Sequence, residues 1–229
     1  MEKAALLKMT GISKTFPGVK ALDNVDFSIS EGEVVGLLGE NGAGKSTLMK
    51  ILSGIYTPDS GDIWLEGKKI VLRGPKHSQR AGISIIHQEL NLLPHLTVAE
   101  NIFIHSLPRK GFSLDKKRLF LDAERLLGEL RFEINPKAIV DDLTVGTQQM
   151  VEIAKALSFQ SKVIIMDEPT SAITEQETAK LFEIIRSLKE KGIAIIYISH
   201  RMEEIYEICD RVVVLRDGCN AGGGLSKEL

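Results

Sequence analysis

The stretch 39-GENGAGKST-47 combines glycine, lysine and hydroxyl residues at the spacing that binds a phosphate chain. Gly39 and Gly44 enclose four residues and are followed by Lys45 and Ser46, which is the pattern G-x-x-x-x-G-K-[ST]. Glycines let successive backbone N–H groups line one concave surface, the lysine ammonium pairs with the outer phosphates, and the serine hydroxyl is a ligand for Mg²⁺. We therefore predict a nucleotide-phosphate site formed by the whole stretch: Gly39, Glu40, Asn41, Gly42, Ala43, Gly44, Lys45, Ser46 and Thr47.

An acidic pair lies at the end of an apolar run further along the chain. Asp167 and Glu168 follow 163-VIIM-166, and open α/β sheets place their ligands at such strand ends. We predict that Asp167 holds Mg²⁺, directly or through water, and that Glu168 polarises the attacking water. A positioned general base contributes about 10²–10⁴-fold in rate. The alternative, a solvated acidic pair, is less favoured because the phosphate loop precedes it.

Two further polar residues follow apolar runs in the same way. His200 comes directly after 193-IAIIYIS-199, at the sheet edge predicted for Asp167 and Glu168. There it could contact the terminal phosphate and hold the water in line. Gln88 follows the run 83-ISII-86 and could reach Mg²⁺ or water, but spacing alone leaves its role open.

The elements that must position these residues alternate between strands and helices. The near-continuous apolar runs 163–166 and 193–199 are typical of parallel strands that are covered on both faces. The segment 174–192 between them is predicted as a helix, because Thr174 and Glu177 have capping-box spacing. A strand–helix–strand crossover of this kind implies a parallel sheet.

The remaining elements surround the phosphate loop or interrupt the α/β pattern. The loop is preceded by a predicted strand at 33–39 and followed by a helix that Gly54 can end. Helices predicted at 115–130 and 147–157 indicate a helical insertion. Other strands are expected at 6–9, 25–29, 63–65, 83–86 and 212–218.

Composition restricts the class of protein. The chain has 229 residues, 43% hydrophobic residues and a formal net charge of −2, with a pI near 6.2. This balance argues against a nucleic-acid binder, which usually carries a basic surface. No apolar run reaches the ~18 residues of a membrane span, and the N-terminus does not resemble a signal peptide. Cys209 and Cys219 are expected to be reduced, so we expect a cytosolic chain unless a partner brings it to a membrane.

The motifs occur in the order used by ATP-binding cassette (ABC) ATPase domains, which the chain resembles over nearly its whole length. It is most similar to the N-terminal cassette of bacterial monosaccharide importers, with the ribose type slightly favoured over the galactose type. The motifs that carry the resemblance are 39-GENGAGKST-47, Gln88, 143-LTVGTQQ-149, 163-VIIMDEPT-170 and His200. The phrases that favour this subfamily are 12-ISKTFPGVKAL-22, 85-IIHQELNLLPHLTVAENIF-103, 145-VGTQQMVEIAKALS-158 and 197-YISHRMEEIYEICDRV-212.

The resemblance implies an α/β fold: a P-loop NTPase (ABC ATPase) core with an N-terminal antiparallel β-subdomain and an inserted α-helical subdomain. One domain would span residues 1–229. Within it, 1–88 and 158–229 would form the β-subdomain and core, and 89–157 the helical subdomain.

The resemblance also implies roles for individual residues. Phe16 matches the aromatic that stacks on adenine, Gln88 the Q-loop residue that joins the nucleotide site to the helical subdomain, and His200 the switch histidine. We call 143–147 the signature segment. It would contact the γ-phosphate bound by a second cassette, through Thr144, Val145 and Gly146.

The implied ligands are ATP and Mg²⁺, the latter held by Ser46, Gln88 and Asp167. The implied partners are a second cassette in the same subunit, membrane permease subunits and, indirectly, a sugar-binding protein outside the membrane. No nucleic acid is expected. The chain would act at the cytoplasmic side of the membrane as a peripheral protein.

Two segments depart from the common family pattern. In the signature, Val145 stands for the first glycine of Leu-Ser-Gly-Gly-Gln and Thr147 for the glutamine, and Thr174 stands where most cassettes have aspartate. Because valine cannot adopt the positive φ that glycine allows, we expect the site built with this signature to be weakened.

Several alternatives stay open at this point. The stretch 219-CNAGGGLSKEL-229 matches the family poorly, which indicates one half of a tandem subunit or a truncated chain. A non-transport ABC machine would predict long heptad arms or a basic surface. A small-molecule kinase would leave the signature segment and His200 without a role. The last alternative is a nucleotide-binding half that is inactive on its own.

Overall fold

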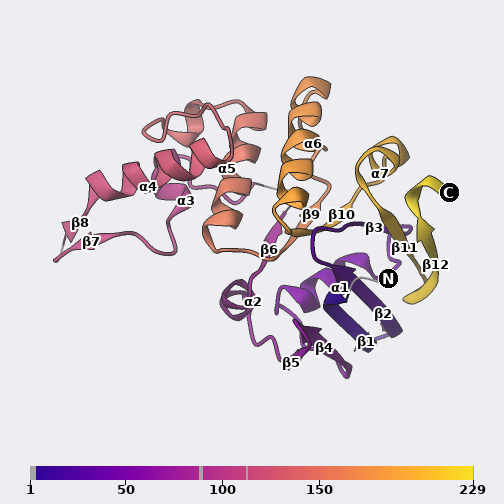
Figure 1. Ribbon diagram of the computed structural model, residues 1–229. Coiled ribbons are helices and arrows are strands. Elements are labelled where there is room, and N and C mark those ends of the chain that lie inside the picture. Colours follow the sequence, from indigo (N-terminus) through magenta and orange to yellow (C-terminus); the bar gives the residue numbers. More distant parts are fainter. Residues whose placement is uncertain (1–3, 88–89, 112, 229) are drawn as a thin grey trace. The chain divides into compact units, whose positions relative to one another are not determined.

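The computed structural model describes residues 4–87, 90–111 and 113–228, which form two compact units (Figure 1). The first unit contains the described residues up to 85 together with 161–168 and 185–228, and the second those of 86–160 together with 169–184. The division that the sequence predicts, at 88/89 and 157/158, differs from this one, because it assigns residues 169–184 to the core and not to the helical part.

The first unit contains a four-stranded antiparallel sheet near the N-terminus. Its strands, in the spatial order β2-β1-β4-β5, are β1 (Ala5–Phe16), β2 (Val19–Ser30), β4 (Ser60–Leu65) and β5 (Lys68–Ile70). Alternate residues of β2 such as Val25, Phe27 and Ile29 are buried, as expected for a sheet with one covered face. β1 and β2 extend well beyond the predicted segments, because their hairpin continues through polar residues that carry no apolar alternation.

A six-stranded sheet forms the second layer and positions the predicted site. Its order is β12-β11-β3-β10-β9-β6, with β3 (Val34–Leu38), β6 (Ile83–Ile86), β9 (Val163–Asp167), β10 (Ala194–Ile198), β11 (Arg211–Arg216) and β12 (Cys219–Leu225). β9 and β10 run parallel, and Ile198 lies beside Asp167. The predicted parallel crossover is therefore confirmed.

The strand β12 was not predicted. Its residues Gly222, Gly223 and Gly224 carry no side chains that could show a strand pattern, and glycine is disfavoured in strands. The backbone nevertheless pairs with β11 in an antiparallel hairpin, with Val213 opposite Gly223. The backbone hydrogen bonds to β11 thus outweigh the low strand propensity of the three glycines.

Helix α1 (Lys45–Leu52) joins the core of this unit. Its buried residues Leu48, Met49, Ile51 and Leu52 share one apolar cluster with residues of both sheets, such as Met9 and Leu37. Gly54 follows at φ +74° and ends the helix as predicted, with its N–H donating to the carbonyl of Ile51.

The second unit is mainly helical, and α3, α4 and α5 lie side by side in it (Figure 1). The elements are α3 (Val98–Ile102), the short hairpin of β7 (Arg109–Lys110) and β8 (Ser113–Leu114), α4 (Lys116–Glu129), a 3-10 turn (Val140–Asp142) and α5 (Val145–Ser158). The predicted helical insertion is confirmed. The apolar face of α4 consists of Leu119, Ala123 and Leu127, whereas Leu121 is 62% exposed.

Helix α5 begins two residues earlier than the sequence predicts. Thr144 is the N-cap, and its hydroxyl accepts a hydrogen bond from the backbone N–H of Thr147 at 3.2 Å. Residues 145–147 of the signature segment therefore form the first turn of the helix.

The other helices are α2 (Pro75–Ala81), α6 (Glu175–Glu190), α7 (Met202–Ile208) and a short 3-10 turn (Ser226–Glu228). The capping box of α6 is formed as predicted, since the Thr174 N–H donates to Glu177 at 3.0 Å and the Glu177 N–H donates to the Thr174 hydroxyl. Among the residues that the structure describes, no helix combines the length and the apolar character needed to cross a bilayer.

Candidate active site

The phosphate loop connects the end of β3 to the start of α1, and its backbone requires glycine. Gly44 has φ +103°, and a Cβ there would lie 2.7 Å from Leu22 Cδ2 and 2.8 Å from the carbonyl oxygen of Ala21. At Gly39 a Cβ would lie 2.3 Å from the carbonyl oxygen of Leu215. The glycines thus allow a close approach of backbone segments as well as an unusual dihedral angle.

Lys45 folds back over its own loop. Its Nζ donates to the carbonyl oxygens of Gly39 at 2.6 Å and Glu40 at 3.0 Å, and the residue is only 8% exposed. Burial lowers the pKa of the Lys45 ammonium, while the nearby carboxylates of Glu168 and Asp167 raise it. A phosphate chain at this position would offer the ammonium stronger acceptors than two neutral carbonyls.

Glu168 and His200 meet at the ends of two neighbouring parallel strands. Glu168 directly follows β9, and its N–H donates to the carbonyl of Ile198 in β10 at 2.9 Å. His200 Nε2 lies 2.9 Å from Glu168 Oε1. Glu168 also has φ +47°, an uncommon backbone for a residue with a side chain, and such outliers concentrate at functional sites. Glu168 and His200 thus lie at the same edge of the sheet, as predicted, and they also contact each other directly, which the sequence does not predict.

Glu204, for which the sequence motifs predict no role, holds the segment that carries His200. This carboxylate is 3% exposed and accepts hydrogen bonds from the Tyr197 hydroxyl at 2.9 Å and the Ser199 hydroxyl at 2.8 Å. It also pairs with Arg201 at 3.0 Å. In the sequence, Tyr197 and Ser199 precede His200 and Arg201 follows it, so Glu204 fixes the chain before and after the histidine. A glutamate four residues after the histidine, inside a helix with buried neighbours, is the sequence signal that could have pointed to it.

We expect Glu204→Ala to lower the free energy of unfolding by about 2–6 kcal/mol, since it removes the carboxylate that accepts from two buried hydroxyls, at about 1–3 kcal/mol each. Urea denaturation followed by circular dichroism measures this change. Glu203→Ala is the matched control, because Glu203 is the exposed neighbour in the same helix. Equal stabilities of the two variants would contradict the role given to Glu204.

The signature segment lies entirely in the second unit; Leu143 and Thr144 are extended, and residues 145–147 have helical backbone. Val145 is the first residue of α5 and 44% exposed, so in this conformation it needs no positive φ. The expectation that position 145 needs a positive φ is therefore wrong for this conformation. Whether the site built with the segment is weaker stays a prediction.

Phe16 is placed at the end of β1, outside the apolar core. Its ring packs edge-on against Tyr56 with centroids 5.1 Å apart, and the Lys14 Nζ lies 5.7 Å from its centroid. The predicted contact with adenine is compatible with this half-buried position. Gln88, a predicted catalytic residue and Mg²⁺ ligand, lies outside the described residues.

Ser46 and Asp167 supply the oxygen atoms that suit Mg²⁺. Ser46 is the second residue of α1, and Asp167 ends β9 close enough to Lys45 to influence its pKa. The part of the chain that the structure describes contains no group of three or more His, Cys, Asp or Glu side chains able to hold a metal. Mg²⁺ is usually bound through one or two carboxylates plus substrate phosphates, and this donor set fits that type of site.

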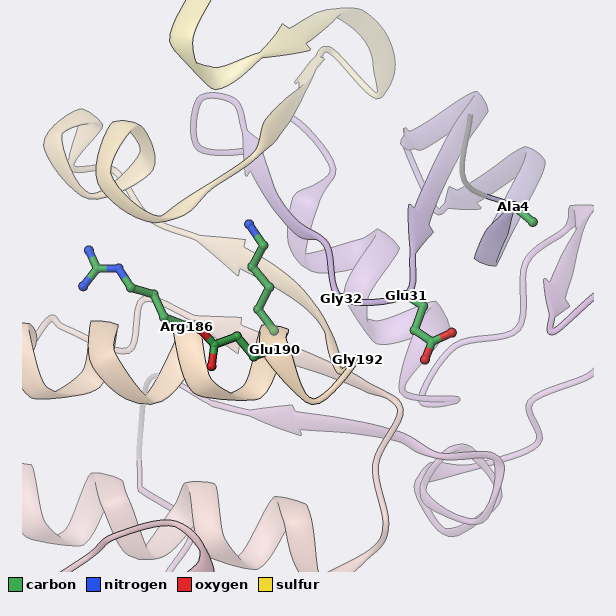
Figure 2. A pocket seen from close by; sticks show the side chains of 7 residues that line it. Ala4, Glu31, Gly32, Arg186, Glu190 and Gly192 are labelled. Atoms are coloured by element: carbon green, nitrogen blue, oxygen red, sulfur yellow. The ribbon is translucent and has the colours of Figure 1, made fainter. Parts of the chain in front are cut away.

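A separate hollow in the first unit lies at the opposite ends of the strands (Figure 2). Glu31 and Gly32 precede β3 and Gly192 precedes β10, whereas the phosphate loop follows β3. The charged residues in its lining are of both signs, and one of them, Arg186, pairs with Glu207 at 2.8 Å. This mixed lining does not resemble a site for a polyphosphate.

Comparison with known proteins agrees with this geometry. A family model described as ABC transporter matches residues 22–171. The chain belongs to the ABC transporter family. The solved structure of an ATP-binding cassette of an ABC transporter in its ADP conformation is similar with a TM-score of 0.87 and 29% identity, covering 99% of this chain and 93% of that one. The predicted fold class, an α/β P-loop core with antiparallel strands and a helical insertion, is confirmed for this ABC family member.

Two sequence relatives narrow the subfamily. A putative ribose/galactose/methyl galactoside import ATP-binding protein of Agrobacterium fabrum (strain C58) is 58% identical over 217 residues, which cover 95% of this chain and 43% of that protein. A ribose import ATP-binding protein of Clostridium perfringens (strain 13) is 53% identical and covers 100% of this chain and 46% of that protein. This ABC chain thus spans less than half the length of these relatives.

Proposed function

We propose that the chain is a Mg²⁺-dependent ATPase cassette that powers the import of a monosaccharide, ribose-like, through a membrane permease. The observation that carries the proposal is the convergence of Lys45, Asp167, Glu168 and His200 at the strand ends next to the phosphate loop. The names of the two sequence relatives support sugar import, with ribose common to both.

In this proposal ATP binds along the loop 39–47. Phe16 stacks on the adenine ring, backbone N–H groups of the loop bind the phosphate oxygens, and Lys45 moves from its carbonyl acceptors onto the β- and γ-phosphates. Ser46 and Asp167 would hold Mg²⁺, with Gln88 as a further ligand. The metal, when bound, neutralises charge that develops on the phosphates.

Hydrolysis needs one residue that activates water and others that stabilise charge. Glu168 accepts a proton from the attacking water, and His200 donates to the γ-phosphoryl oxygens from the adjacent strand end. The Glu168–His200 contact of 2.9 Å holds the two side chains next to each other before ATP binds. The hydrogen bond from the Glu168 N–H to the Ile198 carbonyl holds the ends of β9 and β10 together.

The proposed partners follow the family resemblance. A second cassette supplies the other signature for the ATP bound here, and Thr144, Val145 and Gly146 contact the nucleotide of that partner. Permease subunits receive the motion, a sugar-binding protein delivers the substrate, and the cassette works as a peripheral protein at the cytoplasmic face of the membrane.

Uptake of radiolabelled sugars by cells that express the complete subunit with its permease tests this function. We expect ATP-dependent uptake of ribose that Glu168→Gln abolishes. Uptake of galactose in preference to ribose would correct the substrate, and full uptake by the Glu168→Gln variant would contradict the proposal.

We further expect the 229-residue chain alone to be mainly monomeric and a feeble ATPase. Charge on the γ-phosphoryl group must be stabilised from both sides, and one side requires the signature of a partner cassette. Two linked cassettes meet at an effective concentration of about millimolar for a short flexible linker, which an isolated chain lacks.

Light scattering with ATP, in the Glu168→Gln background that retains the nucleotide, measures this self-association. A stable ATP-dependent dimer at low micromolar protein, or robust hydrolysis by the wild-type chain, would contradict the expectation.

A further inference from the structure

The two segments that depart from the family pattern contact one another through a single side chain. Glu177 connects Thr174 to Thr144 of the signature segment, 30 positions apart in the sequence. Its Oε2 accepts from the Thr174 N–H and hydroxyl at 3.0 Å each, and its Oε1 accepts from the Thr144 hydroxyl at 3.4 Å.

The carboxylate of Glu177 also covers the first turn of α5. A Cβ built on Gly146 would lie 2.1 Å from both the carboxyl carbon and Oε1 of Glu177, so the carboxylate rests directly against the backbone at this position. The Thr144 hydroxyl in turn contacts the Thr147 hydroxyl at 3.0 Å and the Thr147 N–H at 3.2 Å. The hydrogen bonds from Thr174 lower the pKa of Glu177, which is therefore an anion at neutral pH.

We infer that Glu177 controls how well the signature segment captures the γ-phosphate of a partner cassette. The inference rests on the proposed function, in which Thr144, Val145 and Gly146 contact that phosphate. A threonine hydroxyl has one proton to donate, so Thr144 cannot donate to Glu177 and to a phosphate at once. The Glu177 carboxylate is also a negative charge beside the residues that bind the γ-phosphate, so the carboxylate and the phosphate repel one another. Glu177 thus competes with the phosphate for the signature segment.

The substitution Glu177→Gln tests this, because it removes the charge and keeps the helix cap. A capping box accepts glutamine as well as glutamate at this position, so the fold is retained. Glu175→Gln is the matched control. Glu175 is an exposed acid in the same first turn of α6, and its substitution by glutamine removes the same formal charge. All variants are made in the Glu168→Gln background of the 229-residue chain. Two copies of this chain would present the 143–147 signature to both nucleotides.

We expect the dissociation constant of the ATP-dependent dimer, measured by sedimentation velocity, to fall about tenfold in Glu177→Gln, as the loss of one unit of like-charge repulsion near the phosphate implies. Glu175→Gln should not change it. The gain should vanish with ADP, which lacks the γ-phosphate, and should shrink at high salt. Glu177→Ala removes the same charge and should change the dimer in the same direction.

Titration of each monomeric variant with a fluorescent ATP analogue separates two kinds of failure. If no variant binds ATP, the proposed function itself is wrong. If all bind ATP equally but Glu177→Gln forms no tighter dimer than Glu175→Gln, or no dimer at any soluble concentration, the inference about Glu177 is overturned and the residue only caps α6.

Discussion

Replacing Glu168 by glutamine should stop ATP turnover by the proposed importer complex and leave ATP bound. The glutamine keeps the shape of the side chain and its place at the end of β9 but cannot accept the proton of the attacking water. A positioned general base accounts for about 10²–10⁴-fold in rate, so we expect a decrease of this size in kcat. The affinity for ATP should stay within a few-fold of the wild type, because Lys45 and the loop are untouched.

Steady-state phosphate release and equilibrium ATP binding measure the two effects separately. Glu203→Gln is a suitable control, as it removes an exposed acid from α7, close to His200 in the sequence. Turnover of Glu168→Gln within a few-fold of wild type would show that Glu168 is not the base, and loss of ATP binding would show that it has a structural role instead.

The second large effect is expected for Lys45→Ala, which should abolish tight ATP binding. The ammonium is the cation that the loop itself supplies, and hydrogen bonds to charged groups contribute about 1.5–3 kcal/mol each. Loss of two such bonds to the β- and γ-phosphates predicts at least about a 100-fold rise in the dissociation constant. Because burial lowers the pKa of Lys45, affinity for ATP should also begin to fall at a lower pH than for an ordinary lysine.

Isothermal titration with ATP and Mg²⁺ measures this dissociation constant. Lys68→Ala serves as the control, since Lys68 is an exposed lysine in β5 of the same unit. An unchanged dissociation constant for Lys45→Ala would rule out the assignment of the loop 39–47 as the phosphate site.

The parts of the fold that follow local patterns could be predicted from the sequence. The apolar runs of β9 and β10 are long enough to indicate buried parallel strands, and the capping box of α6 is local to residues 174–177. The positions of Asp167, Glu168 and His200 at one sheet edge follow directly from these strands.

Other features depend on contacts that no local pattern reports. The glycine-rich strand β12 forms because β11 offers its edge, and the start of α5 depends on how the Thr144 hydroxyl is used. Glu204 looks like a surface acid in the sequence, and its role arises from hydroxyls that the fold brings to it. The capping of α6 by Glu177 is local and predictable, but its contact with the Thr144 hydroxyl, 33 positions away, is not.

A crystal structure of the Glu168→Gln chain with ATP and Mg²⁺ is the most direct measurement of the central claim. We expect the triphosphate along residues 39–47, with Lys45 Nζ released from the carbonyls of Gly39 and Glu40 and bound to the β- and γ-phosphates. Mg²⁺ should lie between Ser46 and the phosphates on the side of Asp167. Nucleotide bound elsewhere, such as in the hollow beside Glu31 and Gly192, or a Lys45 still bonded to its own loop, would contradict the account.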